Sequence, residues 1–257
     1  MTDVLTYSLV IGIFVGVAAG YLGSLMVLKK MALVGDAMSH VALPGLALGI
    51  LFNFDPFFGA FAVLFAAAII VWYLGRVTKL SYEALIGAMF TTALAVGVLL
   101  IPQVDLLEAL FGDISNVNFL DVLIAVAVSL AAIILTRIIY KNMILGMISE
   151  DLAISKGIKI GRTNLLYLLL VSAVVALGIR ITGTLLVGFL VVVPAATAKN
   201  LSLSSLRYAV LSAVFSVICS LAGIFLSSYL SVPPGPMVVL SGLAVFLVTV
   251  PIKLHMR

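Results

Sequence analysis

Charged residues are scarce in this chain of 257 residues. Only 9% of its residues are Asp, Glu, Lys or Arg, against about a quarter in an ordinary soluble domain. By contrast, 64% are hydrophobic, against about 45–50% in such a domain. A chain of this length cannot build an interior large enough to bury so much apolar side chain away from water. The composition therefore excludes a soluble enzyme and indicates that lipid surrounds much of the protein.

Several chemical motifs are also missing. Cys219 is the single cysteine, so no disulfide can form within the chain and no CxxC metal or redox motif exists. There is no GxxxxGK[ST] phosphate loop, and neither HExxH nor GxSxG occurs. The chain is therefore not expected to be an enzyme. If it supports active transport, the energy must come from an ion gradient or from a separate ATPase.

Helix-length apolar runs follow one another along the chain, with short polar breaks between them. About 20 apolar residues cross a bilayer as a helix, whereas the strands of membrane barrels are about ten residues long and alternate in polarity. The sequence predicts an all-α, polytopic membrane helical bundle with eight or nine transmembrane segments, forming a single domain over residues 1–257. The nine runs are 7–28, 33–52, 57–75, 84–101, 122–140, 165–179, 181–198, 208–230 and 237–252.

Two of these runs leave the number of crossings open. The run 165–179 is short, and 181–198 follows it with almost no loop, so the pair could instead be one broken helix or a re-entrant segment. The first run follows Asp3 without a basic region and is long enough to span, so no cleaved signal peptide is expected.

The breaks between the runs alternate in charge, and the acidic loop 102–121 ends at Asp121. If every run crosses, thirteen of the fourteen Lys and Arg residues fall on one side and only Arg180 on the other. The positive-inside rule then places the N-terminus outside and the C-terminus in the cytoplasm. The net charge of +4 reflects this asymmetry rather than nucleic-acid binding. The acids of the other side could attract a cation or dock a positively charged donor, or they could be ordinary loop residues: Asp55, Asp105, Glu108 and Asp113.

The longest polar stretch, 141–162, falls on the basic side. Within it Ser149 can cap a short helix that has Glu150 and Asp151 in its first turn, and Gly157 can end that helix. Two interpretations remain open from these residues. The helix is either a linker between two bundles or a docking element for a cytoplasmic partner.

The segment GDAMSHVALPG, residues 35–45, contains the strongest chemical feature. Asp36 and His40 lie four residues apart, so on a helix they share one face. Ionisable groups at membrane depth are costly and usually mark an ion path or a functional site. One carboxylate and one imidazole make half a coordination shell, and two copies at a two-fold axis would complete a site for zinc or manganese.

Other interpretations of this segment concern packing alone. Asp36 and His40 could form an interhelical ion pair, or Asp36 could snorkel, because it lies only six residues beyond Lys30. Pro44 and Gly45 follow directly, and a break there could free carbonyl groups to face a pathway or could be a plain kink.

Five segments together resemble a known family. The run LVGDAMSHVALPGLALGILF, residues 33–52, looks like the signature of the membrane permease subunit of zinc- and manganese-type ABC importers, the high-affinity metal uptake systems of bacteria. Four further segments are similar to family motifs and occur in the family's order: YEALIG (82–87), LFGDI (110–114), TGTLLVGFLVVVPAATA (182–198, containing Pro194) and PPGPMVVLSGLAVFLVTV (233–250).

The resemblance implies a function and a set of partners. Asp36 and His40 match the family's metal-coordinating positions, and the transported ion would be Zn²⁺ or Mn²⁺, with Fe²⁺ compatible with the same ligands. No cofactor is expected. The permease would be a multi-pass protein of the cell membrane that works as a homodimer. Its other partners would be a cytoplasmic ABC ATPase subunit and an extracytoplasmic metal-binding protein.

The resemblance also gives the capped helix a role. Residues 149–160 would form the coupling helix that inserts into the ATPase, with Glu150, Asp151, Ala153 and Gly157 as the coupling residues. The pattern Asp151-x-Ala153-x-x-x-Gly157 is similar to the E-A-A-x-x-x-G motif of importer permeases, with Asp in place of Glu and Leu152 in place of the first Ala. The rival interpretation is an ion-coupled secondary metal transporter, in which Asp36 would be a proton or sodium site and no ATPase would be needed.

Overall fold

A computed structural model of the chain describes residues 2–100, 117–184, 187–202 and 204–255. Within these ranges every regular element is a helix and no strand occurs. The helices are α1 (Thr2–Leu28), α2 (Leu33–Val41), α3 (Leu43–Leu51), α4 (Pro56–Thr78), α5 (Tyr82–Leu100), α7 (Phe119–Ile148), α8 (Glu150–Ser155), α9 (Ile160–Thr182), α10 (Val187–Leu201), α11 (Ser205–Leu230) and α12 (Pro234–His255).

The helices match the predicted membrane fold. Among the described residues, eight helical stretches are long and apolar enough to cross a membrane, with α2 and α3 together making one of them. The apolar helix α10 has only 15 residues. The prediction of an all-α, polytopic helical bundle with eight or nine transmembrane segments is confirmed.

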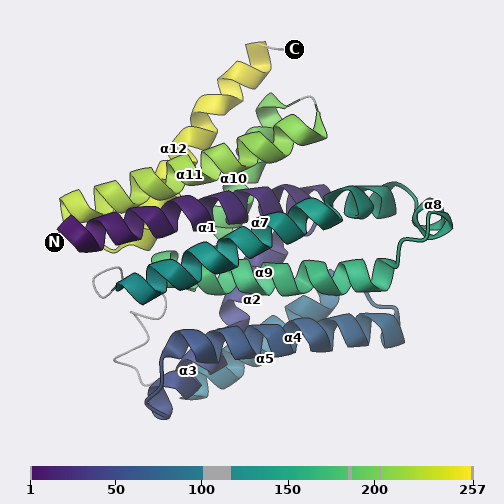
Figure 1. Cartoon of the computed structure of the whole chain (residues 1–257), viewed down its shortest axis with the longest axis horizontal. Helices are drawn as coiled ribbons and strands as arrows, with labels where there is room; N and C mark the ends of the chain where they lie inside the picture. Colours follow the sequence, from purple (N-terminus) through teal and green to yellow (C-terminus); the bar gives the residue numbers. More distant parts are fainter. Residues whose placement is uncertain (1, 101–116, 185–186, 203, 256–257) are drawn as a thin grey trace.

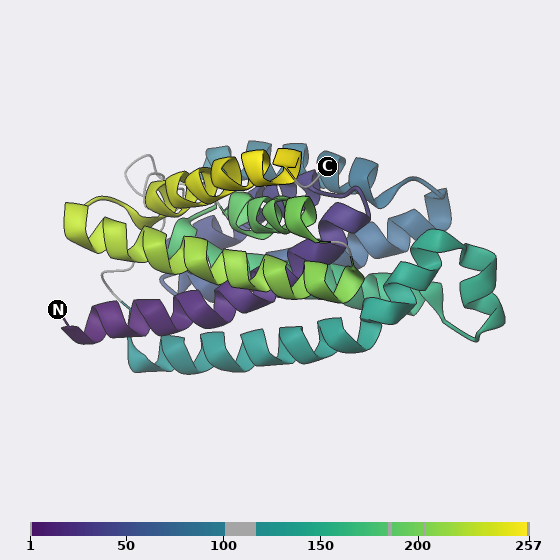
Figure 2. The same cartoon turned by 90° about the horizontal axis from the view of Figure 1, so that it is seen from above.

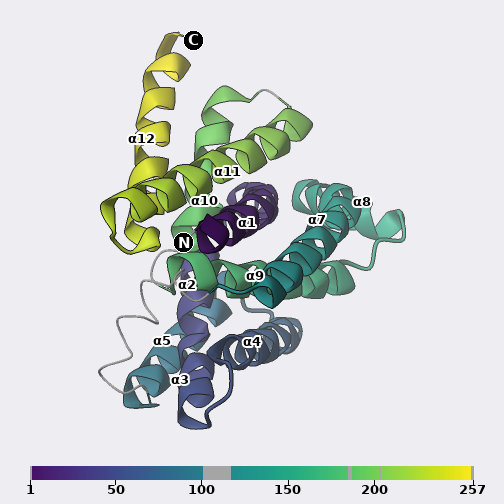
Figure 3. The same ribbon diagram turned by 60° about the vertical axis from the view of Figure 1, so that its left-hand side comes forward.

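The bundle has a central layer and two flanking groups. Figure 1 shows α1, α4, α7, α9 and α11 running roughly side by side, with α8 beyond the ends of α7 and α9. In Figure 3, α11 and α12 lie on one side, α3, α4 and α5 lie on the other, and α2 and α10 lie between them. The N-terminus lies at the end opposite α8, as Figure 2 shows. Helices α2 and α10 therefore lie at the centre of the bundle, between the two flanking groups.

Helix α1 packs most closely on α11. Gly12, Gly16 and Gly20 of α1 recur every four residues, and a Cβ atom at Gly20 would lie 2.7 Å from the Cβ atom of Ser216. The hydroxyl group of Ser212 donates a hydrogen bond to the Gly20 carbonyl oxygen. Small residues let membrane helices approach one another where no hydrophobic force drives them together. This contact holds α11 against the centre of the bundle.

The loops are shorter than the sequence predicts. The stretch 141–162 is not one polar loop, because α7 continues to Ile148 and α9 begins at Ile160. The prediction that 165–179 is a short crossing is also wrong, since α9 has 23 residues. Here α9 and α10 are two separate helices, and the short one is α10. The ends of α7 and α9 contain polar residues such as Asn142 and Asn164, so in the sequence these helix ends resemble a loop.

One acid assigned to an external loop belongs to a helix cap. Asp121 is 6% exposed, and its carboxylate accepts a hydrogen bond of 3.0 Å from the N–H group of Asn118. The Asn118 side chain accepts one of 3.1 Å from the Asp121 N–H group, which completes a capping box at the start of α7. Asp55 similarly caps α4. The acids Asp105, Glu108 and Asp113 and the segment 110–114 lie outside the described residues.

The second apolar run is broken at Ala42, between α2 and α3. Pro44 lies in the first turn of α3, and its ring nitrogen has no hydrogen to donate to the His40 carbonyl group. Gly45 lies directly against the backbone of Gly59 in α4, where no side chain fits. The break therefore sets the direction of α3 and closes it onto α4, directly after the two candidate metal ligands.

Candidate metal site and the α8 cavity

Asp36 and His40 lie one turn apart on α2, in the middle of the bundle. Asp36 is exposed on the surface of the single chain, and His40 is partly buried. Between them, Ser39 is completely buried, and its hydroxyl group donates a 2.6 Å hydrogen bond to the Asp36 carbonyl oxygen. The two candidate ligands therefore share one face, as the spacing predicts.

The backbone at Asp36 is pressed against α10. A Cβ atom at Gly188 would lie only 2.6 Å from the Asp36 Cα atom and 2.7 Å from its Cβ atom. Nonbonded carbon atoms essentially never lie so close together, so only glycine fits at this position without a shift of the backbone. Gly188 thus allows α10 to support the back of Asp36 while the carboxylate stays accessible. The sequence motif around 182–198 contains this glycine, but the contact joins residues 152 positions apart, which the sequence does not reveal.

The imidazole ring of His40 packs against an aromatic ring of a neighbouring helix. Its ring centroid lies 5.3 Å from that of Phe90 in α5, at an interplanar angle of 58°. Its Nδ1 atom is buried and has no hydrogen-bond partner among the described residues. A buried polar atom without a partner is costly and usually has a ligand or a water molecule to satisfy it. The ring is therefore positioned by packing and keeps a nitrogen available for coordination.

A single chain does not complete a metal site. In the parts of the chain that the structure describes, no three His, Cys, Asp or Glu side chains come together in a group that could hold a metal ion. A protein-bound zinc ion usually has four ligands, three or four of them from the protein. Asp36 and His40 supply two. Any complete shell must take its other ligands from outside these residues.

Pro194 lies inside α10 and leaves one carbonyl group without its helical donor. That carbonyl belongs to Leu190, four residues earlier. The buried hydroxyl group of Ser216 in α11 lies 3.4 Å from the Leu190 oxygen and donates to it. Within a membrane a neighbouring serine is a common way to satisfy a carbonyl freed by proline. Pro194 therefore bends α10 at a point where α11 compensates for it.

The short helix α8 has the local structure that the sequence predicts. Ser149 caps it by accepting a 3.2 Å hydrogen bond from the Leu152 N–H group. Ala153 is completely buried, whereas Glu150 and Asp151 are exposed. Gly157 has a φ of 76° in the turn that follows. Ala153 thus packs α8 against the bundle, while the two acids of its first turn stay accessible.

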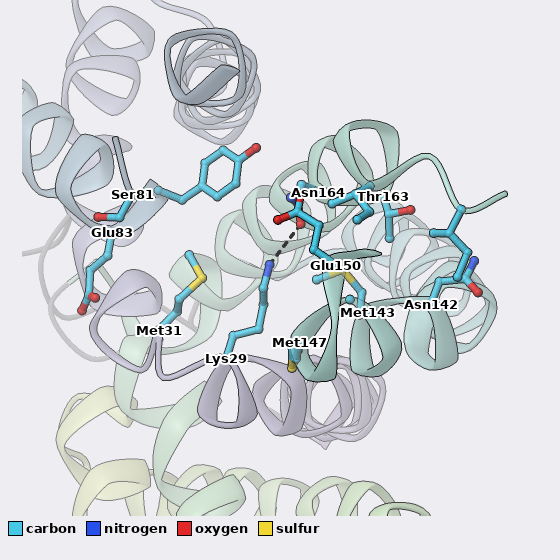
Figure 4. Close-up of a pocket in the computed structure, with 14 residues that line it drawn as sticks. Lys29, Met31, Ser81, Glu83, Asn142, Met143, Met147, Glu150, Thr163 and Asn164 are labelled. Atoms are coloured by element: carbon cyan, nitrogen blue, oxygen red, sulfur yellow. Dashed lines mark hydrogen bonds between the residues drawn. The ribbon is translucent and has the colours of Figure 1, made fainter. Parts of the chain in front are cut away.

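A cavity of about 360 Å³ lies between α8 and the helix ends beside it, lined by both charged and apolar side chains. We call it the α8 cavity. Its walls come from the α1–α2 turn, the start of α5, the end of α7, α8 and the start of α9, and include Lys29, Tyr82, Glu83, Asn142, Glu150 and Asn164 (Figure 4). Trp72 of α4 closes the same end of the bundle by donating a 2.7 Å hydrogen bond to the Gly161 carbonyl oxygen.

Lys29 is the central cation of this cavity. Its Nζ atom donates a 3.1 Å hydrogen bond to the Asn164 side chain and lies 4.7 Å from the centroid of the Tyr167 ring. Burial removes water from the ammonium group and lowers the pKa of Lys29 from 10.5 to about 8. Sequence reasoning placed Lys29 only among the basic loop residues, because nothing in its neighbours distinguishes it from Lys30.

These features define a class of protein before any comparison. A membrane helical bundle with an accessible Asp36 and a partly buried His40 on one central helix points to a transport protein, because intramembrane ionisable groups usually mark ion paths. The chain belongs to the ABC 3 transport family, whose model matches residues 1–253.

Relatives of this chain include permeases named for manganese import and for zinc uptake. It is 31% identical to the manganese import system permease protein ScaB of Streptococcus gordonii over 94% of this chain and 88% of that protein. It is 29% identical to the high-affinity zinc uptake system membrane protein ZnuB of Haemophilus influenzae over 97% of each.

A solved structure has the same fold. PsaBC from Streptococcus pneumoniae, determined in complex with Fab, superposes with a TM-score of 0.82 and 31% identity over 95% of this chain and 90% of that one. The chain is therefore the permease subunit of a metal ABC transporter and a multi-pass protein of the plasma membrane.

Proposed function

We propose that two copies of this chain form the translocation pathway of an ATP-driven importer of Mn²⁺ or Zn²⁺, with the metal held by Asp36 and His40 of both copies. The observation that carries the proposal is the state of these two side chains. Both lie on one face of a membrane-embedded helix, the carboxylate is accessible and the buried imidazole nitrogen lacks a partner. Intramembrane ionisable groups of this kind mark ion paths.

The second copy follows from the ligand count. Two ligands per chain become four at a two-fold axis, a set of two carboxylates and two imidazoles that suits Zn²⁺, Mn²⁺ and Fe²⁺. Imidazole and carboxylate do not discriminate among these ions by affinity alone, because zinc binds more tightly than manganese to almost any such site. Selectivity would come from geometry and from the metal that the delivering protein supplies.

The orientation follows from charge. The α8 end of the bundle contains Lys29, Lys30, Arg76 and Lys79, which favours the cytoplasmic side, and the C-terminus would also be cytoplasmic. The ATPase subunit would then dock on α8, with Glu150, Asp151, Ala153 and Gly157 as the coupling residues. An extracytoplasmic metal-binding protein would deliver the ion at the opposite end. ATP binding would shift the population between outward- and inward-facing states of the site.

The test compares Asp36 with Asp55, a second carboxylate of the same chain that serves as the control. The permease is reconstituted in proteoliposomes with its ATPase subunit and metal-binding protein, and ATP-dependent uptake of Mn²⁺ and Zn²⁺ is measured. Asp36→Asn and His40→Ala are expected to lower uptake by more than about 100-fold, since loss of even an outer partner of a metal ligand costs about 10–100-fold. Asp55→Asn is the matched control, because Asn also caps a helix well and the cap of α4 survives.

Two outcomes would contradict the proposal. Wild-type uptake in both Asp36→Asn and His40→Ala would remove these residues from the pathway. Uptake by the reconstituted chain alone, driven by a proton or sodium gradient without ATP, would support the secondary-transporter alternative instead.

A further inference from the structure

The α1–α2 turn connects the α8 cavity directly to the candidate metal ligands. Helix α1 ends at Leu28, Lys30 adopts a left-handed φ of 60°, and α2 begins at Leu33. Lys29 is therefore the first residue of a short connection into the helix that contains Asp36 and His40. A side chain that holds this connection also influences where α2 begins.

Backbone hydrogen bonds hold this connection in place. The N–H group of Lys29 donates to the Leu25 carbonyl oxygen at 2.9 Å, and that of Met31 donates to the Met26 oxygen at 2.9 Å. The N–H group of Val34 then donates to the Met31 oxygen at 3.1 Å, inside the first turn of α2. Met31 is itself buried and lines the cavity. A displacement of Lys29 is thus passed along hydrogen-bonded backbone to α2 rather than absorbed by a flexible loop.

Lys29 currently has a neutral hydrogen-bond partner although carboxylates line the same cavity. Its bond goes to the Asn164 amide oxygen of α9, while Glu150 of α8 and Glu83 of α5 also form the cavity wall. In Figure 4, Glu150 reaches toward the region of Asn164 and Lys29, whereas Glu83 points away. A lysine bonds more strongly to a carboxylate than to an amide. Glu150 is therefore the carboxylate available as a second partner for Lys29, and it belongs to the helix on which the ATPase would dock.

We propose that Lys29 is a positioning residue that couples α8 to α2, by exchanging its partner between Asn164 and Glu150 when α8 moves. This inference rests on the proposed function, in which the ATPase acts on α8. The cavity gives Glu150 space to approach without displacing a packed side chain, and each position of α8 then favours one of two arrangements of the α1–α2 turn. Such a discrete pair of arrangements is what allows two distant sites to bias one another.

The experiment measures ATP hydrolysis and Mn²⁺ uptake in the same proteoliposomes, using the complex of permease, ATPase and metal-binding protein. Lys29→Gln is expected to lower the amount of Mn²⁺ imported per ATP hydrolysed by about tenfold, within the usual range of coupling between two sites. ATP hydrolysis continues, and Lys29→Arg restores most of the ratio. Lys30→Gln is the matched control, because it removes the same charge from the adjacent, exposed position and leaves the ratio unchanged.

A second pair of variants tests the exchange itself. Glu150→Gln is expected to lower the same ratio, and the double variant Lys29→Gln/Glu150→Gln is expected to be no worse than the poorer single variant, because both changes remove one interaction. Glu150 is exposed, so its substitution does not threaten folding if Lys29→Gln proves unstable.

The outcomes separate the two proposals. An unchanged ratio in Lys29→Gln, or additive losses in the double variant, overturns the role of Lys29 while ATP-driven uptake by the wild type still supports the proposed function. No ATP-driven uptake by the wild-type complex contradicts the proposed function, and the coupling role falls with it.

Discussion

The surroundings of Asp36 and Lys29 differ sharply, although the two residues are only seven positions apart. Behind Asp36 the backbone of α10 is so close that a methyl group at Gly188 would overlap it. Around Lys29 a cavity of about 360 Å³ separates five elements. Close packing fixes the position of a metal ligand to a fraction of an ångström, whereas open space lets a side chain change partners. The same short stretch of chain is therefore rigid where the ion would bind and adjustable where the ATPase would act.

Of the variants that compare these two regions, the one that adds a methyl group on the rigid side is expected to have the largest effect. Gly188→Ala is expected to lower Mn²⁺ uptake by at least about tenfold, since overpacking costs about 1–3 kcal/mol and here must displace Asp36 or α10. Gly87→Ala in α5 is the control, because nothing lies within 4 Å of a Cβ atom there. Uptake and the affinity for Mn²⁺ are measured for both variants. Equal behaviour would show that the close approach does not position Asp36.

The adjustable side is expected to show a pH dependence of stability. The pKa of Lys29 is about 8 in the folded protein and 10.5 when the side chain is free in water. Between these values the unfolded chain binds more protons than the folded one, so Lys29 makes stability rise with pH. Below pH 8 both states are protonated and the burial penalty is fully present. Between the two pKa values, the contribution of Lys29 to the free energy of unfolding rises by about 1–3 kcal/mol.

Comparing the wild type with Lys29→Met isolates this contribution. Unfolding in detergent is followed at pH 7.5 and at pH 9.5, and the wild type is expected to gain stability relative to the variant as the pH rises. The other titratable groups around Lys29 are Glu83, Glu150, Tyr82 and Tyr167, and they are unchanged in the variant. A parallel pH response of the two proteins would mean that the ammonium group is not desolvated.

A smaller effect is expected where α11 supports the proline in α10. Ser216→Ala removes the donor to the Leu190 carbonyl oxygen and is expected to cost about 0.6 kcal/mol, the average for hydrogen bonds between membrane helices. Ser129→Ala in α7 is the matched control, because its buried hydroxyl group has no hydrogen-bond partner within the described residues. Unfolding in detergent compares the two. A loss in Ser129→Ala as large as in Ser216→Ala would refute the role given to Ser216.

The sequence sufficed for the features that depend on composition and local spacing. Long apolar runs predict the membrane helices because a bilayer demands about 20 apolar residues per crossing. The spacing of Asp36 and His40 places them on one face, and Ser149 marks the start of α8. Helix ends were less predictable. Asp121 counted as a loop acid because its capping role depends on the geometry of Asn118, and the polar ends of α7 and α9 resembled a loop.

Contacts between distant segments were beyond the sequence. Gly188 faces Asp36 across 152 positions, and Lys29 meets Asn164 across 135. Neither pairing has a local signal, because a glycine in an apolar helix and a lysine at a helix end each have many ordinary roles. Only the packing of α2 on α10, and of α1 on α9, brings these residues together.

The stoichiometry of metal binding tests most directly whether two copies share one site. Mn²⁺ binding to the purified permease–ATPase complex is measured by equilibrium titration. We expect one tightly bound ion per two permease chains, lost in Asp36→Asn and in His40→Ala while the complex stays assembled. One ion per permease chain, or undiminished binding in both variants, would contradict a site built from Asp36 and His40 of two copies.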